Sequence, residues 1–223
     1  MNKKTLRDVD LKGKRVVMRV DFNVPIKEGV IKDDTRIKGA LASIKYVLEN
    51  GGSLVLMSHL GRPAEKGYEA DFSLKPVAEY LSKMLGKPVV FAADCANADK
   101  EVAAMKPGDI VMLENTRFYA EEQGKVKKKE GMTDDEYKAK KAEMKEKQLK
   151  LAEKLASYGD IYCNDAFGTA HRAHASTAVI TKFLKPAVAG FLMEKEIAYL
   201  GSAVDEQFRI LPEELVKQVF VPL

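Results

Sequence analysis

The sequence contains 223 residues, which is enough for one large α/β domain or two small ones with a substantial core. Hydrophobic residues make up 46% of the chain and charged residues 31%, which describes an ordinary soluble globular protein. The 37 basic residues are nearly balanced by 33 acidic ones, so the net charge of +4 does not indicate a nucleic-acid or membrane partner.

The cysteines and the N-terminal segment indicate a cytoplasmic protein. Cys95 and Cys163 lie far apart and neither belongs to a CxxC pair, which favours reduced thiols. No apolar signal segment follows the lysines of 1–10, and no apolar run is long enough to span a membrane. No grouping of cysteine and histidine has the spacing of a zinc site, so we expect no structural metal.

Apolar runs of strand length alternate with amphipathic helical segments from residue 14 to about residue 195. In chain order, the pattern predicts strands within 14–25, 53–63, 88–94, 109–118 and 160–172, and helices within 35–52, 74–86, 99–105 and 133–158. The first helix has its apolar residues at helical spacing: Ile37, Leu41, Ile44, Val47 and Leu48. This alternation predicts a three-layer α/β fold, with a parallel sheet between helices.

The segment at 121–150 is rich in lysine and raises the possibility of a nucleic-acid-binding surface. Its acidic residues are interleaved with the lysines, and Tyr137 is its single aromatic residue. Nucleic-acid-binding surfaces combine basic charge with a series of aromatic rings. A solvated helix face is therefore the better interpretation.

Polar and cationic side chains follow four of the predicted strands, where each strand ends. The carboxyl ends of parallel strands meet at one edge of a sheet, where ligands bind beside helix N-termini. The residues expected to converge there are Asp21, Asn23, His59, Arg62, Arg117, His171 and Arg172. Arg36 adds a cation close to Asp34 and Thr35, either of which is expected to cap the next helix.

Arginine at these positions is informative, because lysine outnumbers arginine in the rest of the sequence. The planar guanidinium binds phosphate or carboxylate oxygens in pairs. Four arginines around one cleft therefore predict a ligand with more than one anionic group. Asp21 and Asn23 either form an Asx turn before Pro25 or orient a substrate hydroxyl, and Gly61 and Gly168 fit tight turns or close approach to a ligand.

Six segments in order resemble the N-terminal half of the phosphoglycerate kinase family: "RVDFNVP", "DDTRI", "LMSHLGRP", "LENTRF", "NDAFGTAHRAHAS" and "GFLMEKEIAYL". The resemblance covers roughly residues 5–200. It implies a Rossmann-like domain at 1–200 that binds phosphoglycerate, as the N-terminal half of a two-domain kinase. Residues 201–223 remain as an atypical tail, although 212–220 have helical spacing.

Members of the family transfer a phosphoryl group reversibly between ATP and the carboxylate of 3-phosphoglycerate, which gives 1,3-bisphosphoglycerate in glycolysis. The resemblance implies that Arg36 is catalytic and reaches the migrating phosphoryl group. It assigns the hydroxyl and carboxylate end of the substrate to Asp21 and Asn23, and the 3-phosphate to His59, Arg62, Arg117 and Arg172. His171 and His174 are expected in the basic surroundings of the site.

The nucleotide-binding half of the family has no counterpart in this sequence. Neither GxxxxGK[ST] nor GxGxxG occurs, so we expect no site for Mg-ATP or Mg-ADP and no turnover by this chain alone. The alternative function is a non-catalytic module that binds small phosphorylated carboxylates. The resemblance also implies a monomer, with neither nucleic acid nor a membrane as partner.

Overall fold

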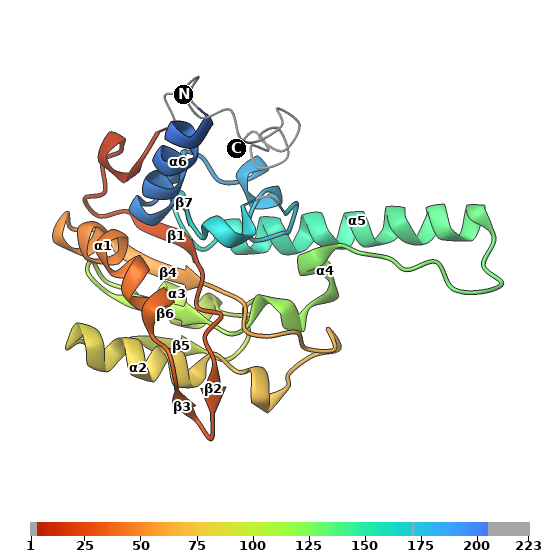
Figure 1. The fold of residues 1–223 in the computed structure, drawn as a ribbon, viewed down its shortest axis with the longest axis horizontal. Coiled ribbons are helices and arrows are strands. Elements are labelled where there is room, and N and C mark those ends of the chain that lie inside the picture. Colours follow the sequence, from red (N-terminus) through yellow and green to blue (C-terminus); the bar gives the residue numbers. More distant parts are fainter. Residues whose placement is uncertain (1–3, 171, 205–223) are drawn as a thin grey trace.

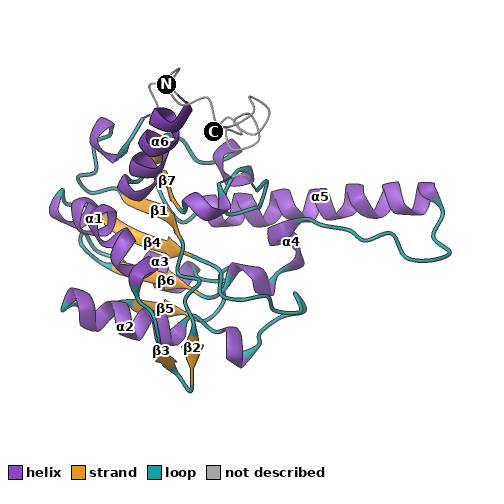
Figure 2. Cartoon of the chain, viewed as in Figure 1, coloured by secondary structure: helices purple, strands orange, loops and turns teal. Residues whose placement is uncertain are grey.

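The computed structural model describes residues 4–170 and 172–204, which form three layers (Figures 1 and 2). The central sheet has six strands in the order β5–β6–β4–β1–β7–β8, and all neighbouring strands are parallel. Its strands are β1 (Arg15–Val20), β4 (Ser53–Met57), β5 (Val90–Ala92), β6 (Ile110–Leu113), β7 (Ile161–Asp165) and β8 (Ala187–Ala189). The predicted α/β fold with a parallel sheet is thereby confirmed.

Helices cover both faces of this sheet. The α-helices are α1 (Thr35–Glu49), α2 (Lys75–Leu85), α3 (Asp99–Ala103), α4 (Ala120–Gln123), α5 (Asp134–Ala156) and α6 (Phe191–Val204). Short 3-10 helices are η1 (Leu6–Asp8), η2 (Ala70–Phe72), η3 (Thr116–Phe118), η4 (Phe167–Thr169) and η5 (Val179–Lys182). A small antiparallel hairpin joins β2 (Ile26–Lys27) to β3 (Val30–Ile31). We did not predict this hairpin, α4, β8 or α6 from the sequence. The hairpin strands, α4 and β8 each span two to four residues, which is too short a window for a hydrophobic pattern to identify.

Alternate residues of the strands face opposite sides and build two cores. In β1, Val16, Met18 and Val20 face the core formed with α1 and α2, whereas Val17 faces the core formed with α3, α5 and η5. Arg19 points to the same side as Val17 and is 0% exposed. A charge inside an apolar strand is costly unless it is paired, so the position of Arg19 calls for a partner.

Helix α1 confirms the helix predicted within 35–52, but it is not capped as expected. Asp34 occupies the N-cap position, and its side chain makes no capping hydrogen bond. Its carboxylate instead accepts a hydrogen bond from the Tyr80 hydroxyl at 2.7 Å. The backbone N–H of Thr35 donates to Asp33 Oδ1 at 2.8 Å, so the residue before Asp34 satisfies the start of the helix.

Helix α5 projects from the body of the molecule, at the right of Figure 1. Its buried residues all lie in its C-terminal half: Gln148, Leu151, Ala152, Leu155 and Ala156. Along the helix, Lys147 pairs with Glu143 at 2.6 Å and Lys150 pairs with Glu146 at 2.6 Å. The structure thus shows the solvated helix face that the interleaved charges of this segment predicted.

Candidate functional site

A cavity of about 320 Å³ lies at the carboxyl edge of the sheet. The loops after β1, β4, β6 and β7 and the first turn of α1 supply its lining residues: Asp21, Asn23, Arg36, His59, Gly61, Arg62, Arg117, Gly168, Thr169 and Arg172. All the site residues assigned from the family motifs belong to this set, so the structure brings them together at one cavity, and their roles stay predictions. His171 lies outside the described residues.

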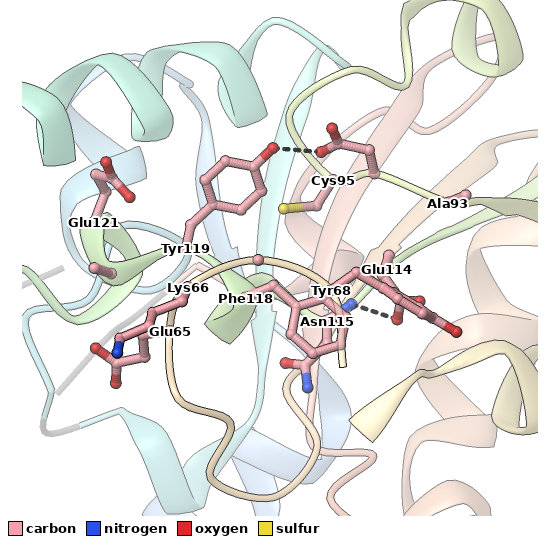
Figure 3. A pocket seen from close by; sticks show the side chains of 13 residues that line it. Glu65, Lys66, Tyr68, Ala93, Cys95, Glu114, Asn115, Phe118, Tyr119 and Glu121 are labelled. Atoms are coloured by element: carbon pink, nitrogen blue, oxygen red, sulfur yellow. Dashed lines mark hydrogen bonds between the residues drawn. The ribbon is translucent and has the colours of Figure 1, made fainter. Parts of the chain in front are cut away.

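A second cavity, of about 460 Å³, lies at the ends of β5 and β6 (Figure 3). Three aromatic rings and four carboxylates line much of it: Tyr68, Phe118, Tyr119, Glu65, Asp94, Glu114 and Glu121. The Tyr119 hydroxyl donates to Asp94 Oδ1 at 2.7 Å. Because clustered carboxylates repel phosphate, the smaller, arginine-lined cavity is the candidate anion-binding site.

Gly61 joins two walls of the arginine-lined cavity through its backbone. Its N–H donates to Asn23 Oδ1 at 2.8 Å, and its carbonyl oxygen accepts a hydrogen bond from Arg117 Nη1 at 2.9 Å. Its φ of +62° lies in the left-handed region, and an added Cβ would overlap the ring of Phe72. The tight turn that the sequence suggested at Gly61 is therefore present, and it positions Arg117.

Asp21 and Arg36 form an ion pair at the mouth of the cavity. Arg36 Nη1 lies 2.5 Å from Asp21 Oδ2, with side-chain exposures of 51% for the arginine and 14% for the aspartate. The backbone N–H of Asn23 donates to the other carboxylate oxygen of Asp21 at 3.3 Å, which is the contact of an Asx turn. The Asx turn that the sequence left as one alternative is thus observed, and Asp21 Oδ2 is directed to Arg36.

The two described histidines near the site are neutral. Burial, followed by the charge of Arg19, lowers the pKa of His59 to about 2. Burial, followed by the charge of Arg117, lowers the pKa of His174 to about 3. His174 does not line the 320 Å³ cavity but a neighbouring one of about 640 Å³, together with Arg62 and Arg117. It therefore borders the site as an uncharged ring.

Arg19 is a residue of the site region that the sequence analysis did not select. Its Nη2 lies 2.9 Å from His59 Nδ1, directly behind the cavity wall. The signal that could have found it is an arginine inside the apolar run of β1. Such a residue is almost never fully buried unless it is paired.

Comparison with known proteins identifies the family. The family model named Phosphoglycerate kinase matches residues 6–211. The chain belongs to the phosphoglycerate kinase family. The phosphoglycerate kinase of Clostridium perfringens is 49% identical over 208 residues, which cover 92% of this chain and 47% of the relative. That of Dictyoglomus turgidum is 50% identical over 214 residues, which cover 94% and 48%.

Solved phosphoglycerate kinase structures share the fold. The enzyme from Coxiella burnetii aligns with a TM-score of 0.74 and 35% identity, covering 92% of this chain and 46% of the other. The chain spans about half the length of the curated relatives it matches, and it corresponds to the N-terminal half of a two-domain kinase. The family match extends past residue 200, where the quoted motifs end, and the domain boundary there stays a prediction.

Neither a membrane-spanning helix, nor a metal-binding cluster, nor a disulfide occurs among the described residues. Among residues 4–170 and 172–204, no helix is long and apolar enough to cross a membrane. Over the same ranges, no group of three or more His, Cys, Asp or Glu is placed to hold a metal ion. Cys95 and Cys163 are buried free thiols. The candidate site itself offers four arginines, the Asp21 carboxylate and neutral hydrogen-bonding groups such as Asn23 and Thr169.

Proposed function

We propose that this chain is the 3-phosphoglycerate-binding half of a phosphoglycerate kinase, which moves a phosphoryl group reversibly between ATP and the substrate carboxylate. The observation that carries the proposal is the 320 Å³ cavity, which collects four arginines and one histidine from the first turn of α1 and from the segments after β4, β6 and β7. 3-Phosphoglycerate has a phosphate at one end and a carboxylate at the other. An arginine-rich cavity at the carboxyl edge of a parallel sheet suits such a ligand.

The 3-phosphate is assigned to one group of lining residues: His59, Arg62, Arg117 and Arg172. Arg117 supports this assignment, because its contact with the Gly61 carbonyl oxygen orients the guanidinium before any ligand binds. Asp21 forms an ion pair with Arg36, and we assign Asp21 and Asn23 to the hydroxyl and carboxylate of the substrate. A carboxylate such as Asp21 is useful there because the substrate hydroxyl is a hydrogen-bond donor.

Arg36 is the catalytic residue in this proposal. Phosphoryl transfer requires alignment of the reacting oxygens and compensation of the charge on the transferred group, without a covalent intermediate. The substrate carboxylate oxygen forms a bond to the γ-phosphorus as the bond to the ADP oxygen breaks. Arg36 lies in the first turn of α1, and Asp21 keeps its guanidinium at the mouth of the cavity.

The remaining parts of the proposal concern the rest of the enzyme. We assign Mg-ATP and Mg-ADP to a second domain, because the chain spans about half the length of its relatives. The phosphoglycerate domain is assigned to 1–200, and the product of the forward reaction is 1,3-bisphosphoglycerate. The whole protein is proposed to act as a cytoplasmic monomer, with neither nucleic acid nor a membrane as partner.

Calorimetric titration with 3-phosphoglycerate tests the substrate assignment. The chain is expected to bind weakly, because half of the cleft formed by two domains is missing. Arg62→Ala removes a charge-assisted contact worth roughly 1.5–3 kcal/mol, so we expect affinity to fall at least tenfold. Lys45→Ala removes one positive charge from an exposed position on α1 and is expected to leave affinity unchanged. Equal losses in both variants would count against the assignment.

A further inference from the structure

Arg19 is a cation held rigidly at the centre of the sheet. It is 0% exposed, and all three nitrogens of its guanidinium have contacts. Nε donates to Ser176 Oγ at 2.9 Å, Nη1 donates to the Val20 carbonyl oxygen, and Nη2 lies 2.9 Å from His59 Nδ1. A planar group fixed at three points has one orientation, so it also restricts the orientation of the His59 ring.

A buried carboxylate compensates the charge of Arg19. Glu122 in α4 is 0% exposed and accepts hydrogen bonds from the Ser176 hydroxyl at 2.5 Å and the Ser176 N–H at 2.9 Å. Because the hydroxyl proton points to Glu122, a lone pair of Ser176 Oγ is available to Arg19. The contacts from Glu122 through Ser176 and Arg19 to His59 therefore exist without any ligand.

The contact between Arg19 and His59 determines which ring nitrogen carries the proton. A guanidinium has only N–H donors and stays protonated in proteins. Nδ1 of His59 must therefore accept this hydrogen bond, and the proton of the neutral ring lies on Nε2. A charged imidazolium would direct an N–H at the guanidinium, which agrees with the lowered pKa of His59.

We propose that Arg19 is a positioning residue, which holds His59 as the neutral tautomer with the proton on Nε2, so that His59 donates this proton to a ligand phosphate. The identity of the ligand rests on the proposed function. The charged and titratable groups that face His59 are Arg19 from β1, Arg117 from η3, and Arg172 and His174 from the loop after β7. A neutral donor among these arginines binds the anion without adding another repelling cation.

NMR of the complete chain tests the tautomer without a ligand. Long-range proton–nitrogen correlations of ¹⁵N-labelled histidine distinguish protonated from unprotonated ring nitrogens, and His59→Gln identifies the His59 signals. We expect a protonated Nε2, an unprotonated Nδ1 and no titration from about pH 5 to about pH 8. A proton on Nδ1, or a titration in this range, would overturn the proposal whatever the ligand is.

Variants of Arg19 test the cause of this state. Arg19→Met removes all donors, so we expect His59 to populate both tautomers and to titrate nearer its ordinary pKa of about 6.5. Arg19→Lys keeps a positively charged donor group without the guanidinium's planar geometry, and it is expected to restore the Nε2 proton in part. Arg15→Met, in the same strand but outside the cavity lining, is the matched control and should leave the His59 signals unchanged. If Arg19→Met does not fold, the His59 tautomer measured in the unaltered chain and in Arg19→Lys still tests the proposal.

Ligand titrations separate this inference from the proposed function. We expect 3-phosphoglycerate to shift the His59 Nε2–H signal, and Arg19→Met to lower its affinity about tenfold. If inorganic phosphate shifts this signal and 3-phosphoglycerate does not bind, the proposed substrate is wrong and the role of Arg19 stands. If 3-phosphoglycerate binds and the signal does not move, His59 is not the donor and the inference is wrong.

Discussion

Gly61 supports the candidate site through its backbone alone. Its N–H and carbonyl oxygen connect the loop after β1 with Arg117, and its left-handed φ brings Arg62 to the cavity. Any residue with a Cβ would meet the Phe72 ring in addition to the backbone strain. The geometry of the arginines therefore depends on a residue that has no side chain.

We expect Gly61→Ala to lower both stability and ligand affinity. Left-handed backbone strain and overlap with Phe72 together are expected to reduce the free energy of unfolding by roughly 1–3 kcal/mol. The shifted loop would also displace Arg62, which weakens 3-phosphoglycerate binding. Urea unfolding and calorimetric titration measure the two effects.

Gly29→Ala is the control for backbone strain alone. Gly29 has a similar φ of +73°, with no atom within 4 Å of an added Cβ, and it does not line the cavity. It should lose some stability and no affinity. Identical results for both variants would mean that Gly61 has no special role in the site.

At the scale of elements, helix α5 packs against the core only through its C-terminal half. Leu155 is 0% exposed in the core beneath the sheet, whereas Tyr137 lies in the projecting half. We expect Leu155→Ala to reduce the free energy of unfolding by about 2–5 kcal/mol, because it leaves a cavity. Tyr137→Ala is expected to cost less than about 1 kcal/mol in the same urea unfolding measurement. Similar losses would show that the projecting half also carries the fold.

The junction between β7 and α6 contains a buried carboxylate. Asp165 is 0% exposed, and its Oδ1 accepts hydrogen bonds from the N–H groups of Leu192 at 2.9 Å and Met193 at 3.3 Å. Its Oδ2 has no hydrogen-bond partner among the described residues. Burial outweighs these hydrogen bonds and raises the pKa of Asp165 to about 6.

This pKa predicts a contribution to stability that changes with pH. The folded state binds the Asp165 proton more tightly than the unfolded state, whose pKa is about 3.9, so this contribution falls as pH rises from about 4 to about 6. Two pKa units correspond to about 3 kcal/mol. In Asp165→Asn this fall should be absent. Urea unfolding at several pH values measures the free energy of unfolding of Asp165→Asn and of the unaltered chain. We expect the difference between the two free energies to change by up to about 3 kcal/mol between about pH 4 and about pH 6. A difference that stays constant over these pH values would contradict the prediction.

At the scale of the whole molecule, this chain is expected to show no ATP-dependent phosphorylation of 3-phosphoglycerate by itself. It spans about half of its relatives' length, and phosphoryl transfer needs donor and acceptor aligned by both halves. Fusion to the C-terminal half of the Clostridium perfringens enzyme should restore turnover. A coupled assay measures the rate, with the intact relative as the positive control.

Within the fused protein, Arg36→Ala should lower turnover more than affinity for 3-phosphoglycerate, because Arg36 acts on the transferred group. Turnover by the unfused chain above the rate in buffer would contradict the division into two halves. No turnover in any fusion, together with intact binding of 3-phosphoglycerate, would favour the non-catalytic binding module.

The sequence by itself determined the order of the main strands and helices, the parallel sheet and the family. Hydrophobic periods of two and 3.6 residues are local properties, so they are readable in one stretch at a time. The same local reading placed Asp21, His59 and Arg117 at strand ends, and a parallel sheet brings such ends to one edge. The strand β8 was not predicted, because three residues are too few to distinguish a strand from a loop by their pattern alone.

Only the tertiary structure decided which of these groups touch and which are charged. Arg19 lies 40 residues from His59 and 157 from Ser176 along the chain, and nothing local to β1 indicates either contact. The local sequence also does not indicate that the arginines line one cavity and that four carboxylates line another, at the ends of β5 and β6. Side-chain orientation, burial and pKa depend on what packs around a group from distant segments, and local hydrophobic periodicity does not contain that information.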